Sequence, residues 1–381
     1  MAKRFLKVAS GLDLFHVLII SILAFSSGCV PTVPAPVTLV DNPQHSYNNG
    51  LKFLEKGEYE WALAEFERAL VLDPKFSPAY VGIGLVKGAK GNFAAAFEAM
   101  AKAKELDGGL ASAAMIRLYT MQKAEGWLGR AEAEFETGRQ KQPQDPALYF
   151  FMGKAYKETL ELGKALSMFQ KVRELKGAYQ REAELEASIV DKIQRARPSS
   201  EIGRQIALKE KLTRLEVALL LLDEGGVDKL LRERPLRPLD SPGRLTSSSQ
   251  EKVPLAVDIL DHPYRDRIEA ILSLRIRGLE AFPDRTFSPA SPLSRADYAV
   301  ILEDILIKVT NEKGLATRYL GQSSPLDDVE SSNYAYNAIM LLFARNILEL
   351  KSPRLFSPEE PMTGSDALLA LRRLRDELRL H

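Results

Sequence analysis

Small and apolar positions recur every 34 or 35 residues along the first half of the chain. Small residues stand where the two helices of a hairpin would touch, and larger apolar residues fill the space between them. The matching positions of the four periods are Gly50, Ala62, Phe66, Ala69 and Pro74; Gly84, Ala96, Met100, Ala103 and Gly108; Tyr119, Ala131, Phe135, Gly138 and Pro143; and Gly153, Ala165, Phe169, Val172 and Gly177. Because one hairpin cannot bury its own apolar face, the pattern predicts four stacked helical hairpins over residues 44–177.

The connections and the end of this array carry their own signals. Gly57, Gly91 and Gly126 occupy matching places between the paired helices, where a tight turn favours glycine, and Leu160 occupies the fourth such place. Residues 178–196 continue as a charged amphipathic helix. We expect this helix to be the solvating cap that an array of stacked hairpins requires.

The period and the placement of the small residues resemble the tetratricopeptide repeat (TPR). The resemblance implies an all-α solenoid that performs no chemistry and binds a protein or peptide on its concave surface. By the repeat register, this surface carries Tyr47, Leu51, Leu54, Val81, Leu85, Ile116, Thr120, Lys123, Phe150, Lys154 and Lys157. One end is then apolar and the other basic, which suits a partner with an apolar stretch and an acidic end. In the alternative interpretation, the lysines are only solvated.

A second kind of repetition follows in the other half of the chain. Residues 212–216 open an apolar helix, and residues 234–254 form a linker rich in proline and serine. Two blocks of sequence further on are 69 residues apart. They are Phe287-Ser288-Pro289 with Leu293-Ser294-Arg295-Ala296-Asp297, and Phe356-Ser357-Pro358 with Met362-Thr363-Gly364-Ser365-Asp366.

The loop at residues 282–289 gives this half a family resemblance. Its sequence, F-P-D-R-T-F-S-P, resembles the F-P-D-G-T-F-x-P loop of S-layer homology (SLH) modules, with Arg285 in place of the glycine. The resemblance implies three helical modules, a degenerate one at 197–233 and two more at 255–324 and 325–381. In SLH proteins, three such modules form a pseudo-threefold unit that binds cell-wall polysaccharide. We therefore expect a cell-wall polymer as a second partner.

Each module opens its second helix with a capping motif. Thr213, Ser294 and Thr363 are each followed three residues later by an acid, so helix initiation alone accounts for the hydroxyl and the acid. Arg214 and Arg295 fall in the first helical turn, where the macrodipole disfavours a cation by about 0.3–1 kcal/mol. We therefore predict that these arginines contact an anionic group on the polymer. The alternative is that both are solvated on the surface.

Two further features bear on the predicted polymer site. Asp284 and Arg285, in the loop of the second module, are predicted to contact the polymer beside the arginines. Gly364 takes the place of the arginine in the third module, so binding is not expected there.

The first 43 residues carry export signals. Basic residues precede an apolar run of nine residues, which is too short to cross a bilayer, and residues 1–28 are predicted to be a signal peptide. Cys29, the only cysteine, follows two serines and a glycine, and this stretch resembles the lipobox of bacterial lipoproteins. The resemblance implies a membrane anchor through a lipid on Cys29, and Val30 implies sorting to the outer membrane. Residues 29–43 hold four prolines and predict an extended tether.

Composition and motifs exclude several classes of function. Lysine and arginine number 52, and aspartate and glutamate 51, so no global field attracts nucleic acid. With one cysteine and four scattered histidines, no zinc site is expected. No phosphate-binding loop, nucleophile elbow or histidine–acid cluster is found, and acids such as Asp327 and Asp328 are interpreted as surface charge. We therefore expect no catalytic residue, metal or cofactor.

These signals together predict a non-enzymatic, lipid-anchored adaptor of the cell envelope. Its hairpin array would bind a protein partner, and its modules would bind cell-wall polysaccharide or peptidoglycan. The alternative is an assembly factor for an envelope complex that binds only proteins and has lost polysaccharide binding.

Overall fold

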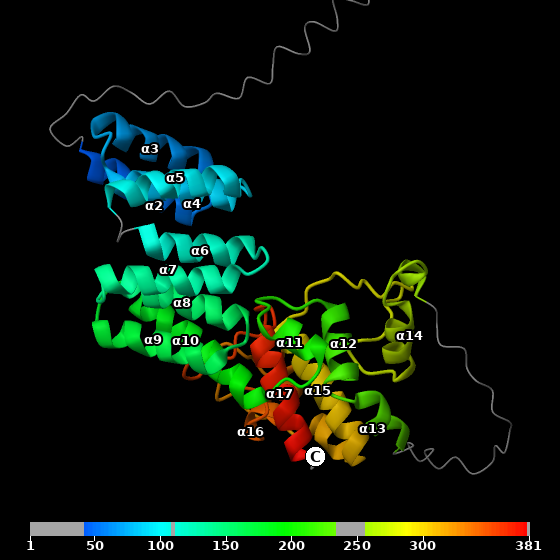
Figure 1. Ribbon diagram of the computed structural model, residues 1–381. Coiled ribbons are helices and arrows are strands. Elements are labelled where there is room, and N and C mark those ends of the chain that lie inside the picture. Colours follow the sequence, from blue (N-terminus) through cyan, green and yellow to red (C-terminus); the bar gives the residue numbers. More distant parts are fainter. Residues whose placement is uncertain (1–41, 108–110, 234–255, 379–381) are drawn as a thin grey trace, which may run out of the picture. The chain divides into compact units, whose positions relative to one another are not determined.

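The computed structural model describes residues 42–107, 111–233 and 256–378 (Figure 1). Every regular element in these residues is a helix, which confirms the predicted all-α fold, and their only strand-like pairings are three isolated bridges. None of the described helices is long and apolar enough to cross a membrane. The predicted signal peptide, Cys29, most of the tether, Gly108 and the linker at 234–254 lie outside the described residues.

The chain divides into two compact units, Met1–Ala155 and Tyr156–His381. The helices of the first unit are α2 (Pro43–Glu55), α3 (Tyr59–Leu72), α4 (Ser77–Ala89), α5 (Phe93–Leu106), α6 (Ala111–Gln122) and α7 (Trp127–Lys141). They pair in chain order as α2 with α3, α4 with α5 and α6 with α7, and α4 also packs against α2 and α6. These consecutive hairpins confirm the predicted helical solenoid. The next helix, α8 (Pro146–Glu158), crosses from the first unit into the second.

Glycines allow the hairpins of the first unit to approach closely. A Cβ atom on Gly50 or on Gly82 would lie 2.5 Å from the ring of Phe66, which itself has no exposed surface. The ring therefore fills the space that the two glycines leave. Ala62 and Ala96, two of the other recurring small residues, are also fully buried. The periodic positions in the sequence are thus positions of helix contact.

The turns between paired helices have a left-handed backbone at all four expected places. The φ angle is +75° at Gly57, +79° at Gly91 and +67° at Gly126. Leu160 replaces glycine at the fourth place and still has a φ of +58°. Because a side chain in this region costs about 1–2 kcal/mol, Leu160 is strained. Its side chain offsets part of that strain by packing against the core of the second unit.

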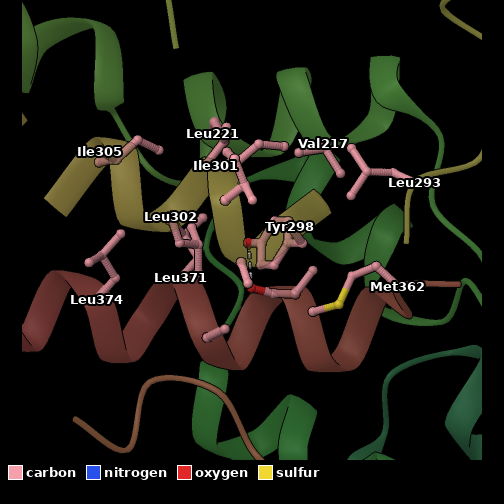
Figure 2. Packing of buried hydrophobic residues seen from close by; sticks show 14 of the residues in the cluster. Val217, Leu221, Leu293, Tyr298, Ile301, Leu302, Ile305, Met362, Leu371 and Leu374 are labelled. Atoms are coloured by element: carbon pink, nitrogen blue, oxygen red, sulfur yellow. Dashed lines mark hydrogen bonds between the residues drawn. The ribbon is translucent and has the colours of Figure 1, made fainter. Parts of the chain in front are cut away.

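The helices of the three modules together build one large apolar core in the second unit (Figure 2). Its elements are α9 (Leu162–Leu175), α10 (Gln180–Ala196), α11 (Glu201–Ala207), α12 (Arg214–Asp223), α13 (Val227–Glu233), η1 (Val257–Ile259), α14 (Arg265–Ser273), α15 (Arg295–Thr310), η2 (Lys313–Thr317), α16 (Tyr336–Ala344) and α17 (Gly364–Glu377). Val217 of α12, Ile301 of α15 and Leu371 of α17 lie in this core. The buried hydroxyl of Tyr298 donates to the carbonyl of Ala367 at 2.9 Å, which satisfies the polar group inside the core.

Three backbone hydrogen bonds join the modules in a closed ring. The amide of Leu212 donates to the carbonyl of Met362, that of Met362 to Leu293, and that of Leu293 to Leu212, each at 2.9 Å. Each of these residues directly precedes the N-cap of α12, α15 or α17. The second helices of the modules therefore start around one pseudo-threefold centre, which is the arrangement that the SLH resemblance implies. We call this part, residues 201–233 and 256–378, the module ring.

Helix α10 differs from the solvating cap expected from the sequence. It packs against α17 as well as α9, and Val190, Ile193 and Ala196 are buried. Ile193 and Ala196 belong to the same core as the modules. The charged pattern of α10 gave no sign of this interface, because α10 contacts α17, which lies at the far end of the sequence.

Candidate functional site

The arginine that opens α12 is built into the module that follows. Arg214 is 7% exposed and lies behind a complete capping box. Its Nε donates to the carbonyl of Phe287 at 2.8 Å. Its Nη1 and Nη2 donate to the carbonyls of Gly278 and Glu280 at 2.7 and 2.8 Å. The guanidinium thus holds together the two ends of the loop in the second module.

Arg295 repeats this arrangement one module later. It is 2% exposed, and its Nε and Nη2 donate to the carbonyls of Phe356 and Glu349 at 2.8 and 2.7 Å. Its Nη1 pairs with the carboxylate of Asp366 at 3.1 Å. The structure corrects the interpretation that both arginines are solvated on the surface. Arg295 is enclosed by protein groups, and contact of Arg214 with a polymer stays a prediction. The buried guanidiniums compensate backbone carbonyls of the neighbouring module, which would otherwise be unpaired.

Two aspartates anchor the loops into which the arginines insert. Asp258 accepts hydrogen bonds from the amides of Phe287 and Ser288 at 2.8 and 2.7 Å. Asp328 does the same in the third module, with the amides of residues 356 and 357 at 2.9 and 2.6 Å. Asp328 is therefore a loop anchor and not merely surface charge. The sequence signal that could have revealed this role is an aspartate upstream of the loop in each module, Asp258 in the second and Asp328 in the third.

The glycine position of the loop motif requires a left-handed backbone. The φ angle is +65° at Arg285 and again +65° at Arg354, its counterpart in the third module. Asp284 accepts hydrogen bonds from the hydroxyl and amide of Thr286 at 2.7 and 3.0 Å, and these bonds lower the pKa of its carboxyl. Asp284 thus shapes the turn. Contact of Asp284 and Arg285, both exposed, with a polymer stays a prediction.

An open cavity of about 600 Å³ lies over Arg214, between the first and second modules, and we call it the first groove. It is lined by Arg214, Gly278, Glu280, Ala281, Phe282, Pro283, Ser291, Pro292, Leu293 and Asp297. The ring of Phe282 is 43% exposed, and the guanidinium carbon of Arg214 lies 4.5 Å from its centroid. An exposed aromatic face next to planar charged groups suits a sugar ring with polar substituents.

The polar groups of the first groove are held in fixed positions. Arg214 uses three of its five N–H donors on carbonyls, which fixes the plane of the guanidinium. One carboxylate oxygen of Asp297 accepts from the amide and hydroxyl of Ser294, at 3.1 and 2.6 Å. The other accepts from the hydroxyl of Tyr334 at 2.7 Å, and burial together with this bond raises the pKa of Tyr334 to about 12. A ligand therefore meets donors and acceptors that need no rearrangement.

The third junction, between α17 and the first module, has no room for an arginine. The amide of Gly364 donates to the carbonyl of Lys209 at 2.7 Å. A Cβ atom on Gly364 would lie 1.8 Å from the carbonyl oxygen of Ile206. The backbone at the end of α11, at Ile206 and Ala207, occupies this space. This explains the glycine that the sequence shows in place of the arginine.

The apolar residues predicted to line a concave binding surface lie mainly in helix contacts. Ile116 has no exposed surface, so its assignment to an open groove is corrected to the interior. Val81, Leu85 and Phe150 are buried as well, between 6% and 8% exposed. The remaining three, Tyr47, Leu51 and Leu54, are half-buried and pack against the core of the first two hairpins. The faces that the register assigned to an open surface therefore pack, at these positions, against neighbouring helices.

The predicted lysines do not share one environment. Lys157 is 11% exposed and pairs with Glu186 of α10, so its charge is already compensated. The ammonium of Lys154 lies 5.8 Å from the ring centroid of Phe150. Lys123 is exposed and follows the last residue of α6, with a left-handed φ of +48°. Contact of Lys123 and Lys154 with a partner remains a prediction.

Comparison with known protein families gives a match for one segment of the chain. Residues 325–368 match the S-layer homology domain, and the match starts where the third module was expected to begin. This part of the chain is therefore similar to the S-layer homology domain. A comparison with curated proteins finds no match to this chain.

Proposed function

We propose that the protein is a non-enzymatic adaptor of the cell envelope that binds cell-wall polysaccharide or peptidoglycan through its modules. The observation that carries the proposal is the first groove. It is an open cavity with an aromatic wall, in a ring of modules of which one matches the S-layer homology domain. Hydrogen bonds at equivalent residues join the three modules in the ring. For this reason, we extend the polymer binding suggested by the family match of the third module to the first and second modules.

The chemistry of the first groove supports a carbohydrate ligand. Phe282 offers an exposed face on which a sugar ring can stack, and its position is fixed by the guanidinium of Arg214 beneath it. The guanidinium of Arg214 suits a carboxylate or a ring hydroxyl. In this proposal, Arg214 acts from the floor of the groove, and Arg295 only holds the ring together.

The hairpins supply the second half of the proposed function. Stacks of helical hairpins commonly present extended surfaces to peptides, and the sequence of this stack resembles TPR units. We place a protein partner on this unit, with the exposed Lys123 and the half-buried Lys154 as its basic contacts. An acidic segment in the partner would complement them.

The membrane anchor completes the proposal. A lipid on Cys29, as the lipobox resemblance implies, would hold the protein at the outer membrane by its N-terminus. Mass spectrometry of the mature N-terminal peptide tests this. A diacylglycerol-modified Cys29 supports the anchor, and a mature form with unmodified Cys29 contradicts it.

An assembly factor that binds only proteins is the second candidate. The third junction favours it, because Gly364 and the backbone around Ile206 leave no groove there. In that case the ring would serve as a packing domain, and the first groove would bind no sugar.

Sedimentation with cell-wall sacculi separates the two candidates. The mature chain carrying Cys29→Ser is mixed with isolated sacculi, before and after secondary polymers are stripped, and the pelleted fraction is measured. Phe282→Ala removes the aromatic wall without touching the guanidinium bonds, and we expect about tenfold weaker binding. Tyr264→Ala is the matched control, because Tyr264 is 42% exposed and does not line the groove.

The proposal survives only if the two variants differ. Loss of pelleting with Phe282→Ala, and not with Tyr264→Ala, supports polymer binding in the first groove. If the unsubstituted chain does not pellet, or if all three proteins pellet equally, polymer binding in the first groove is contradicted. The assembly factor that binds only proteins is then the supported candidate.

A further inference from the structure

The repeat of 69 residues defines a second groove by equivalence with the first. Arg214 and Arg295 bond to carbonyls at equivalent places, since Phe287 corresponds to Phe356 and Glu280 to Glu349. Three other lining residues of the first groove, Phe282, Ser291 and Asp297, correspond to Lys351, Glu360 and Asp366. We call Glu349, Lys351, Glu360 and Asp366 the second groove.

Helix α10 inserts a lysine into this second groove. The ammonium of Lys192 pairs with Asp366 at 2.6 Å and lies 4.0 Å from Glu349. Arg195, one turn further along α10, pairs with Glu349 at 3.2 Å. Lys351 closes the set from the other side, at 3.3 Å from Asp366. Asp366 and Glu349 are thus paired with lysines and an arginine, whereas the equivalent Asp297 in the first groove accepts from Ser294 and Tyr334.

The second groove also lacks the feature that makes the first one suitable for a sugar. Lys351 stands where Phe282 forms the aromatic wall, so no ring is present for stacking. At the third junction the backbone itself fills the space. Among the three junctions of the ring, the first alone combines an open cavity with an exposed aromatic side chain in the described residues.

We propose that the second groove is the docking site of α10, with Lys192 in the place of a ligand, so that the ring offers one polymer site per chain. The part of this proposal that concerns the polymer rests on the proposed function above. The part that concerns α10 does not.

The ion pairs of Lys192 act together with apolar contacts. Ile193 and Ala196 on α10 are buried in the core of the modules and supply the area of contact. Lys192, 18% exposed, then fixes the register of the helix, because Asp366 is buried and accepts a charge-assisted bond. Docking of α10 therefore ties α9, which packs on α10, to the module ring.

Hydrogen exchange on the full mature chain tests the docking without any polymer. Lys192→Ala removes the ammonium, and we expect amides of α10 to exchange about tenfold faster. Lys308→Ala is the matched control, because Lys308 is also 18% exposed and pairs at 2.7 Å with Asp304 on its own helix. Unchanged exchange in α10 of Lys192→Ala, or an equal rise in Lys308→Ala, would overturn the docking role.

Titration with a soluble muropeptide mixture, released from sacculi by a muramidase, tests the single site. We expect one binding event per chain for the unsubstituted protein and for Lys192→Ala, and none for Phe282→Ala. Two events per chain, or half of the sites retained in Phe282→Ala, would overturn the single-site proposal. Absence of any binding by the unsubstituted chain would instead count against the proposed function, while the exchange experiment still decides whether α10 docks.

Discussion

In the hairpin stack of residues 42–155, a helix packs mainly against helices next to it along the chain, whereas the module ring joins residues far apart in sequence. Helix α4 packs mainly against α3 and α5, and its glycines lie against Phe66 of α3, Met100 of α5 and Leu118 of α6. In the ring, the guanidiniums of Arg214 and Arg295 bond to partners 54 to 73 positions away. The closing hydrogen bonds at Leu212, Leu293 and Met362 depend on all three modules at once.

This difference shows how repeated units can be joined in two ways with different consequences. A stack adds nearest-neighbour contacts, so one altered hairpin affects mainly the hairpins beside it. A closed ring cannot lose one junction without loosening the others. The two tryptophans of the chain, Trp61 and Trp127, both lie in the first unit, so their fluorescence reports on the stack. Circular dichroism reports on both units, and the two signals together separate them.

The largest expected effect comes from breaking the ring at Arg295. Arg295→Ala leaves the carbonyls of Phe356 and Glu349 and the carboxylate of Asp366 without their buried partner, and we expect the free energy of unfolding of the ring to fall by about 3–5 kcal/mol. Urea unfolding followed by circular dichroism should show an earlier transition, while the tryptophan fluorescence transition stays in place. Arg318→Ala, at an exposed arginine, is the control and should change neither. Equal stability of Arg295→Ala and the unsubstituted protein would contradict the structural role.

A smaller effect is expected from overpacking the stack at Gly50. A Cβ atom there would lie 2.5–2.9 Å from three atoms of the Phe66 ring, so Gly50→Ala should lower the free energy of unfolding of the stack by about 1–3 kcal/mol. Because the stack holds both tryptophans, the fluorescence transition should move and the ring's part of the dichroism transition should not. A shift of both transitions would show that the two units unfold together.

Acid should weaken the ring through Asp366. Burial alone would raise the pKa of Asp366, but the ammoniums of Lys192 and Lys351 and the guanidinium of Arg295 lower it to about 2. Since the folded pKa lies below the unfolded value of 3.8, the unfolded chain takes up the proton first. The stability from this group, of order 2 kcal/mol, is present above about pH 4 and is lost as the pH falls toward 2.

The stack contains a carboxyl group, Asp145, whose pKa is shifted in the opposite direction to that of Asp366. Burial raises the pKa of Asp145, despite its bond with the amide of Ala147, so the stability from Asp145 is greatest at low pH and declines as the pH rises. Urea unfolding at pH 5, 4 and 3 should therefore show the ring losing stability. Asp366→Asn should remove most of that pH dependence, and an unaltered dependence in this variant would place its origin elsewhere.

The sequence predicted the stack better than the ring for a physical reason. Contacts between neighbouring hairpins recur with the repeat, so the 34- or 35-residue period identifies Gly50, Phe66 and Ala62 as positions of helix contact. The arginines were singled out because they oppose the helix macrodipole, but their partners are backbone carbonyls, which leave no trace in side-chain identity. The sequence therefore found Arg214 and Arg295 and missed that they are buried.

The first groove and the docking of α10 could not be predicted from the sequence. Phe282 was visible only as part of a motif, and nothing local sets it apart as a wall of the cavity. Lys192 and Asp366 are 174 positions apart; in the sequence, Lys192 is one charge of an amphipathic helix and Asp366 is explained by helix capping. Only the closure of the ring brings them together, and closure is a property of the three modules jointly.

The smallest expected effect isolates backbone strain from packing at one turn of the stack. Gly126 and Gly129 both have open space around the position of a Cβ atom, but Gly126 has a φ of +67° and Gly129 lies inside α7 with an ordinary helical backbone. Gly129→Ala should raise the free energy of unfolding by about 0.5–1 kcal/mol, because alanine loses less backbone entropy in a helix. Gly126→Ala should lower it by about 1 kcal/mol, because the left-handed region strains an L-residue. Urea unfolding followed by tryptophan fluorescence measures both, and changes of the same sign in the two variants would show that φ does not decide the outcome at this turn.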